Sequence, residues 1–158
     1  MVLPDLYGGQ RSNDYDRGFA IRDRVGWGTM IARAQAAAAP LPPETVLAGV
    51  SLGAQVAGEV WASRPETAGV VLLHGPCEIP PDARPRLPVQ AHLAVPEPFD
   101  GEGFIADWAE GARGAGVAFE LYRYPGAGHY FTDASLPDHD AAAARLAVDR
   151  ALDLLAAL

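Results

Sequence analysis

The sequence has only one cysteine, Cys77, and it has no long hydrophobic run. A single thiol excludes an intramolecular disulfide, as is typical of proteins that stay in the reducing cytoplasm. No apolar segment approaches the roughly 20 residues that a membrane-spanning helix needs. The first residues, MVLPDLYGG, contain no basic segment followed by an apolar one, so we expect no signal peptide. These absences predict a cytoplasmic protein that does not associate with a membrane.

Basic residues are also scarce, because 12 Lys and Arg stand against 20 Asp and Glu, a net charge of −8. A nucleic-acid-binding surface needs a basic stripe, so we expect no nucleic-acid partner. Hydrophobic residues make up 49% of the chain, which is enough to bury a sizeable core. A length of 158 residues lies within the range of one domain, and we expect residues 1–158 to form a single one.

Short apolar segments alternate along the chain with segments of helical composition. The apolar segments predict strands, the first very short and the last of edge type, at 2–8, 45–51, 68–75, 87–95 and 117–124. The remaining segments predict helices at 18–39, 53–63, 103–113 and 140–158. Near-continuous apolar strands separated by helices are typical of a parallel sheet. We therefore predict an α/β fold, with a mostly parallel sheet and helices on both faces.

A G-x-S-x-G motif, Gly49-Val50-Ser51-Leu52-Gly53, stands where a predicted strand ends and a predicted helix begins. A nucleophile elbow requires this arrangement, in which a strained turn holds the serine hydroxyl clear of the sheet. The Leu52 N–H, at the start of the helix, can then point at a developing oxyanion. We predict that Ser51 is a nucleophile and Leu52 an oxyanion donor. The alternative is that Ser51 only caps the helix.

A serine nucleophile needs a base, and the chain has four histidines. His129 lies in a glycine-rich loop after the last predicted strand, where a parallel sheet carries its catalytic groups, and it is the predicted base. His74 and His92 lie in or at the end of apolar strands, which favours roles in the core, although His92 is also a candidate for lining the site. His139 begins the last helix, and we expect it to be solvated.

The third group should be a carboxylate between the serine and the histidine in the chain. The segment HLAVPEPFDGEG offers Glu97, Asp100 and Glu102. Glu97 is nearest the end of the third long strand, between two prolines that stiffen the loop, and we predict that it accepts a hydrogen bond from the His129 Nδ1–H. Asp100 is the alternative acid. In the remaining interpretation, Glu97, Asp100 and Glu102 are all solvated acids of the loop.

With these positions, the chain resembles the dienelactone hydrolase family of the α/β-hydrolase superfamily. The segments that match are LPDLYGG, VLAGVSLGA, PVQAHLAVPEPFD and YPGAGHYFTDASLP, in this order. The resemblance implies Ser51 as nucleophile, Glu97 at the position of the family's aspartate and His129 as base. It also implies hydrolysis of an ester or lactone through an acyl-enzyme, with no metal and no cofactor.

Two departures from the family pattern concern single residues. The best-known members use a cysteine as nucleophile, whereas this chain has Ser51, and we expect Cys77 to be a buried bystander. Members that act on dienelactone hold its carboxylate with arginines, at positions where this chain has Gly9 and Asp133. Because an acid there repels an anion, we expect the substrate to be a neutral ester or lactone.

A third departure concerns the start of the chain. The family fold has further strands and a helix before LPDLYGG, together with a loop that supplies a second oxyanion donor. We therefore expect an N-terminally truncated α/β-hydrolase fold, with catalysis weakened by about 10²–10³-fold if that donor is lost. An uncovered sheet edge would favour a homodimer. The alternative function is that of a weak or inactive hydrolase remnant that serves as a binding or interaction module. A third possibility is a thioesterase or acyltransferase with the same triad.

Overall fold

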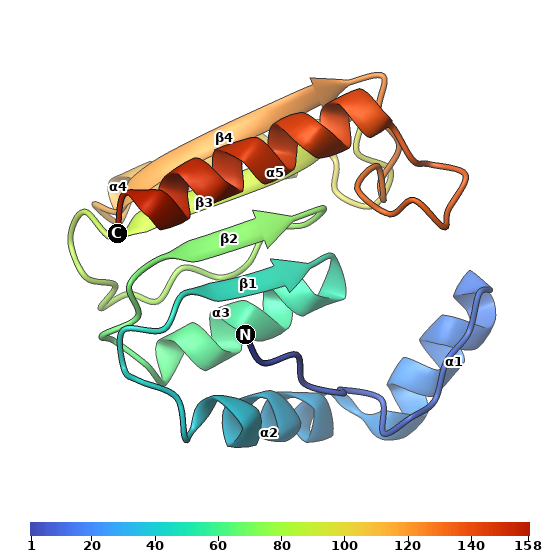
Figure 1. The fold of residues 1–158 in the computed structure, drawn as a ribbon, viewed down its shortest axis with the longest axis horizontal. Helices are drawn as coiled ribbons and strands as arrows, with labels where there is room; N and C mark the ends of the chain where they lie inside the picture. The colour runs from blue at the N-terminus through green and yellow to red at the C-terminus, as the bar shows by residue number, and fades with distance from the viewer. The chain divides into compact units, whose positions relative to one another are not determined.

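The computed structural model describes all of residues 1–158. The chain forms two compact units, Met1–Pro42 and Pro43–Leu158, and each is described by itself (Figure 1). The expectation of one domain over residues 1–158 stays a prediction. None of the helices in either unit combines the length and the apolar character needed to cross a membrane.

The first unit contains two helices, α1 (Tyr15–Val25) and α2 (Trp27–Ala38). The sequence predicts one helix over 18–39, and this is wrong because the chain breaks at Gly26. Gly26 has a φ of +81°, a conformation that glycine adopts without strain and that a continuous α-helix does not contain. Asp14 caps the start of α1 by accepting a hydrogen bond from the Arg17 N–H.

The predicted strand at 2–8 is also wrong, because these residues form a turn. The Asp5 carboxylate accepts hydrogen bonds from the backbone N–H groups of Tyr7 and Gly9. Such local bonds from an aspartate to the next backbone groups compete with extended structure. The turn covers residues 6–9 and includes Gly8 and Gly9, which both have positive φ.

The second unit is built on a parallel sheet of four strands. The strands are β1 (Leu47–Val50), β2 (Val70–Leu73), β3 (Pro88–Val95) and β4 (Ala118–Pro125). They pair in the order of the sequence, with every neighbouring pair parallel. The predicted α/β class is thus confirmed, and β1 and β4 are the two edge strands.

Helices α3 (Leu52–Ala62), α4 (Glu102–Gly114) and α5 (Ala141–Ala156) cover the sheet. The Phe119 ring of β4 packs edge-on against Trp108 of α4, with the ring centroids 5.1 Å apart. The Tyr122 ring of the same strand lies 4.0 Å from the guanidinium of Arg150 of α5. Because odd and even positions of a strand point to opposite faces, α4 and α5 cover opposite faces of the sheet (Figure 1).

The parallel arrangement brings the carboxyl ends of the strands to one edge of the sheet. Ser51 directly follows β1, His74 follows β2, and the loop with Glu97 follows β3. The loop with His129 follows β4. In open α/β sheets this edge is where ligands bind, so the fold brings together the residues that the motifs single out.

Candidate active site

Ser51 occupies a strained turn between β1 and α3. Its φ is +51° and its ψ is −118°, in the left-handed range that non-glycine residues rarely adopt. The Ser51 N–H donates to the carbonyl of Leu73, 2.7 Å away, which ties the turn to the end of β2. The Ser51 side chain makes no capping hydrogen bond to α3. The interpretation of Ser51 as a helix cap is therefore wrong, and its hydroxyl is free for other contacts.

Close backbone approach explains two of the glycines around this turn. A Cβ on Gly49 would lie 2.5 Å from the Cα of Ala54 and would also overlap the Gly53 carbonyl. A Cβ on Gly75, which follows His74, would lie 3.2 Å from the carbonyl oxygen of Ser51. The turn can thus fold tightly because Gly49 carries no side chain, and a side chain at Gly75 would require a small shift of the Ser51 backbone.

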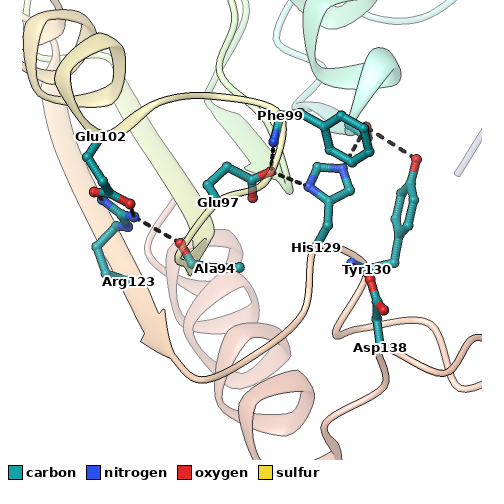
Figure 2. A network of polar contacts seen from close by, with 9 residues as sticks. Ala94, Glu97, Phe99, Glu102, Arg123, His129, Tyr130 and Asp138 are labelled. Atoms are coloured by element: carbon teal, nitrogen blue, oxygen red, sulfur yellow. Dashed lines mark hydrogen bonds and ion pairs between the residues drawn. The ribbon is translucent and has the colours of Figure 1, made fainter.

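The His129 ring bridges Ser51 and Glu97. Its Nε2 lies 2.9 Å from the Ser51 Oγ. Its Nδ1 lies 2.6 Å from the Glu97 Oε1 (Figure 2). With the proton on Nδ1, the ring donates to the carboxylate, and Nε2 accepts the hydrogen bond of the serine hydroxyl. The side chains of His129 and Glu97 are almost fully buried, with 3% and 0% exposed. The low dielectric of this buried site strengthens the attraction between the Glu97 carboxylate and the His129 ring whenever the ring is protonated.

The loop after β3 separates the three candidate acids. Glu97 reaches His129, and the same Oε1 accepts the backbone N–H of Phe99 at 3.2 Å. Glu102 instead pairs with Arg123 of β4, with N–O distances of 2.7 and 2.9 Å (Figure 2). Asp100 is half-buried, and burial together with the nearby Glu97 raises the pKa of its carboxyl. The structure therefore brings Glu97, and not Asp100, to the histidine.

Leu52 is the first residue of α3, so its N–H has no acceptor within the helix. The N–H groups at this end of a helix carry partial positive charge and point outward along the helix axis. Leu52 directly follows Ser51 and begins the helix, as the sequence predicts for an oxyanion donor. The arrangement can accommodate negative charge on an oxygen bound next to the serine.

Tyr130 is a site residue that the sequence analysis does not single out. Its hydroxyl lies 3.4 Å from the Ser51 Oγ. Its ring stands edge-on to the His129 ring, with the centroids 4.5 Å apart (Figure 2). The available signal is its place directly after the histidine. That position alone does not reveal which way the ring points.

The other histidines have different surroundings. His74 is buried, its Nε2 lies 2.6 Å from the Thr132 Oγ1, and its ring lies 5.8 Å from that of His129. Burial, together with the neighbouring His129 and His92, lowers the pKa of His74 to about 4. His74 is thus neutral near pH 7, and it links the end of β2 to the loop after the predicted base.

His92 belongs to a buried polar cluster rather than to the site. Its Nδ1 lies 2.8 Å from the Tyr124 hydroxyl and its Nε2 lies 3.0 Å from the Gln90 Oε1. Burial lowers the pKa of His92 to about 4. Both ring nitrogens of His92 are therefore bonded to residues other than Ser51 and His129. His139 is exposed, as expected, although its Nδ1 contacts the carbonyl of Phe131 at 3.0 Å.

The remaining residues of interest lie outside the contacts of Ser51. Cys77 is buried, and burial raises the pKa of its thiol to about 12, so it stays protonated. Asp133 is exposed on the loop after His129 and accepts hydrogen bonds from Ser135. Gly9 belongs to the first unit. No three His, Cys, Asp or Glu side chains in the chain are grouped as metal ligands.

Comparisons with known proteins give a family match and a fold match. A sequence model of the dienelactone hydrolase family matches residues 1–158. No curated protein sequence matches the chain. One similar solved structure is assigned as a dienelactone hydrolase from Klebsiella pneumoniae subsp. pneumoniae MGH 78578, with a TM-score of 0.74 and 19% identity over 97% of this chain and 73% of that one.

A second similar structure is a dienelactone hydrolase-like promiscuous phosphotriesterase from metagenomic libraries. Its TM-score is 0.65 and its identity 20%, over 90% of this chain and 65% of that one. The chain therefore spans just under two thirds of the length of this relative. At such identities, the likeness to both structures shows the α/β fold alone.

Proposed function

The chain belongs to the dienelactone hydrolase family, and on this premise we propose that it hydrolyses a carboxylic ester or lactone through an acyl-enzyme formed on Ser51. The observation that carries the proposal is the unbroken set of contacts from the Ser51 Oγ to the His129 Nε2, and from the His129 Nδ1 to Glu97. A hydroxyl, a base and a buried orienting carboxylate in this order are what a serine nucleophile requires.

The first half of the proposed reaction acylates the serine. The Ser51 Oγ attacks the carbonyl carbon, its proton passes to the His129 Nε2, and the carbonyl electron pair moves onto the oxygen. The Leu52 N–H stabilises this oxyanion. When the carbonyl reforms, the bond to the leaving oxygen breaks, and His129 returns the proton to that oxygen. The free alcohol leaves, or the opened end of a lactone stays attached to the acyl group.

The second half restores the enzyme with one water molecule. His129 takes a proton from the water as its oxygen attacks the acyl carbon, and a second tetrahedral oxyanion forms. Its collapse breaks the bond to the Ser51 Oγ, which recovers a proton from His129, and the carboxylic acid leaves. Glu97 holds the ring in one tautomer throughout and stabilises the imidazolium in both halves. No net proton or electron is left over.

We also propose that the substrate is neutral. Two features support this. Asp133, four residues after His129, is an exposed carboxylate whose pKa is lowered by hydrogen bonds from Ser135, so it stays charged. Phe99, which packs edge-on against the His129 ring at 4.6 Å, and Val50, which precedes Ser51, leave exposed apolar surface next to the reacting groups.

The experiment is hydrolysis of a p-nitrophenyl ester by the chain and by Ser51→Ala, together with labelling by a fluorophosphonate. We expect the unchanged chain to hydrolyse the ester and to carry the label on Ser51, and the variant to lose both. Ser63→Ala is a matched control, because that hydroxyl, at the other end of α3, contacts the Val60 carbonyl. A folded Ser51→Ala protein with full activity would overturn the proposal. A folded chain that neither reacts nor labels would favour an inactive binding module.

A further inference from the structure

Tyr130 places a hydroxyl next to the proposed nucleophile, 3.4 Å from the Ser51 Oγ. We propose that Tyr130 is a catalytic residue, whose O–H donates a hydrogen bond to the oxyanion of the tetrahedral intermediate. The inference deepens the proposed function and rests on it, because it requires acylation of Ser51. It adds a side-chain donor to the backbone donor of Leu52.

The change in bonding at the Ser51 Oγ during the reaction gives the first argument. In the resting site this oxygen donates to His129 and accepts from the Tyr130 hydroxyl. Once the oxygen is bonded to the acyl carbon, it becomes a poor acceptor. The oxyanion forms on that same carbon, next to the Oγ, and carries full negative charge. A charged oxygen accepts a much stronger hydrogen bond than a neutral one, so the Tyr130 bond is strongest in the intermediate.

The number of donors gives the second argument. An oxyanion hole usually holds more than one preorganised donor, and loss of one donor costs about 10²–10³-fold in rate. The start of α3 supplies the Leu52 N–H. The Tyr130 hydroxyl lies at the serine within the same compact unit, so it can act as a further donor.

The packing of Tyr130 gives the third argument, because a donor is effective when it needs no reorientation. Its ring stands edge-on to His129 at 4.5 Å and to His74 at 5.9 Å. Its backbone N–H donates to the Asp138 Oδ2 at 3.3 Å. Asp138 itself lies so close to Gly128 that a Cβ there would come within 2.7 Å of its Cγ. The loop thus fixes both ends of the residue.

No proton is transferred in this role. Tyr130 keeps its proton in both tetrahedral intermediates, while His129 carries the proton that moves between Ser51, the leaving oxygen and water. The hydrogen bond forms as the carbonyl oxygen gains charge and weakens again when the carbonyl reforms. Such a bond stabilises the transition state more than the bound substrate, and it therefore acts on kcat rather than on KM.

The test is Tyr130→Phe, which removes the hydroxyl and keeps the ring that packs against His129. The control is Tyr122→Phe, which removes a hydroxyl from β4, where the ring stacks on His92 and Arg150. With a p-nitrophenyl ester, we expect Tyr130→Phe to lower kcat by about 10²-fold. KM should change by less than about threefold, and Tyr122→Phe should change neither.

A second readout is the inhibition constant of a trifluoromethyl ketone, which forms an anionic hemiketal on the serine. Tyr130→Phe should weaken this inhibitor by about the same factor as it lowers kcat. If Tyr130 had a purely structural role, the change in the inhibition constant would not match the change in kcat. Circular dichroism and the melting temperature check that the variant is folded.

The outcomes separate this inference from the proposed function. If Ser51→Ala abolishes activity while Tyr130→Phe keeps full kcat, or changes KM alone, the Tyr130 inference is wrong and the proposed function stands. If kcat falls only for esters with poor leaving groups, Tyr130 assists the leaving oxygen and the inference is also wrong. If Ser51→Ala stays active, the proposed function itself fails.

Discussion

The Nδ1 of His129 lies 2.6 Å from the Oε1 of Glu97, and the same oxygen accepts the backbone N–H of Phe99 at 3.2 Å. One carboxylate oxygen therefore orients the ring and is itself oriented by the loop after β3. The Phe99 N–H holds the flexible Glu97 side chain in one position, and this in turn fixes the orientation of the His129 ring. The relationship gives Glu97 a defined role that its loop neighbours do not share.

We predict that Glu97→Gln lowers kcat by about 10³–10⁴-fold on a p-nitrophenyl ester. The amide carries no negative charge to stabilise the imidazolium. When its NH2 group faces the ring, it also donates to an Nδ1 without a proton, which leaves His129 in the tautomer that cannot accept the proton of Ser51. Steady-state kinetics measure the loss. Because the amide is isosteric, the Michaelis constant should stay within a few-fold of that of the unchanged chain.

Asp100→Asn is the matched control for this prediction, since it makes the same chemical change three residues further along the loop. We expect it to keep kcat within about threefold, because the hydrogen bond to the His129 Nδ1 comes from Glu97 and the Asp100 carboxyl interacts with the ring only electrostatically. If Asp100→Asn were inactive and Glu97→Gln active, the assignment of the orienting acid would be reversed.

The two glycines of the G-x-S-x-G motif should respond in opposite ways to alanine. A Cβ on Gly49 would overlap the start of α3, whereas a Cβ on Gly53 would meet nothing within 4 Å. We predict that Gly49→Ala lowers the free energy of unfolding by about 3 kcal/mol or more, the scale of a severe steric clash in a core. Gly53→Ala, within α3, should change it by at most about 1 kcal/mol and in the stabilising direction.

Urea denaturation followed by circular dichroism measures both free energies. The comparison is sharp because the two sites are four residues apart, share the same turn and receive the same added methyl group. Equal destabilisation by the two substitutions would contradict the prediction. It would show that the close approach of the Gly49 and Ala54 backbones is not needed for stability.

Buried histidines should make the stability of the chain depend on pH. Burial lowers the pKa of His74 from 6.5 to about 4, with Asp133 and Asp138 opposing the shift only in part. Between these two pH values the unfolded chain binds a proton at His74 and the folded chain does not. Stability should therefore fall as the pH drops below 6.5, by at most about 1.4 kcal/mol per pH unit for this residue, and level off near pH 4.

His74→Gln tests this prediction, because glutamine can still reach Thr132 with a hydrogen bond and does not titrate. The free energy of unfolding, measured in urea from pH 8 to pH 4, should depend less steeply on pH in the variant. His92, whose pKa is also lowered to about 4, should account for part of the slope that remains. An identical slope in the two proteins would mean that His74 has the same pKa in the folded and the unfolded chain.

The sequence predicts the sheet and the order of the site contacts well, because both follow from local patterns. Four of the five apolar segments become parallel strands, and Ser51, Glu97 and His129 each follow one of them closely. The carboxyl ends of parallel strands meet at one edge, so residues at these positions come together without any knowledge of the side-chain packing.

Other features depend on contacts that the pattern does not contain. Whether Glu97 or Asp100 contacts the His129 ring depends on the path of the loop, which turns the Phe99 N–H back onto Glu97. The direction of the Tyr130 ring depends on its packing against His74 and His129. The break at Gly26 and the turn at Asp5 show local backbone chemistry overriding the periodicity of the neighbouring residues.

The last prediction concerns the charge of the substrate. We expect the unchanged chain to hydrolyse a neutral p-nitrophenyl ester with a higher kcat/KM than an ester of the same length that ends in a carboxylate. Asp133→Asn should raise kcat/KM for the anionic ester by about twofold to threefold at low salt and leave the neutral ester unchanged, because exposed charges interact weakly. Raising the ionic strength to about 0.5 M should remove most of the gain, since the Debye length becomes shorter than the separation of the charges. Asp153→Asn is the control, because that carboxylate lies with Pro88 and Ala118 at the opposite ends of β3 and β4. A higher kcat/KM for the anionic ester would contradict the proposal of a neutral substrate. An equal rise in kcat/KM for that ester in Asp133→Asn and Asp153→Asn would contradict the proposal that Asp133 repels anions.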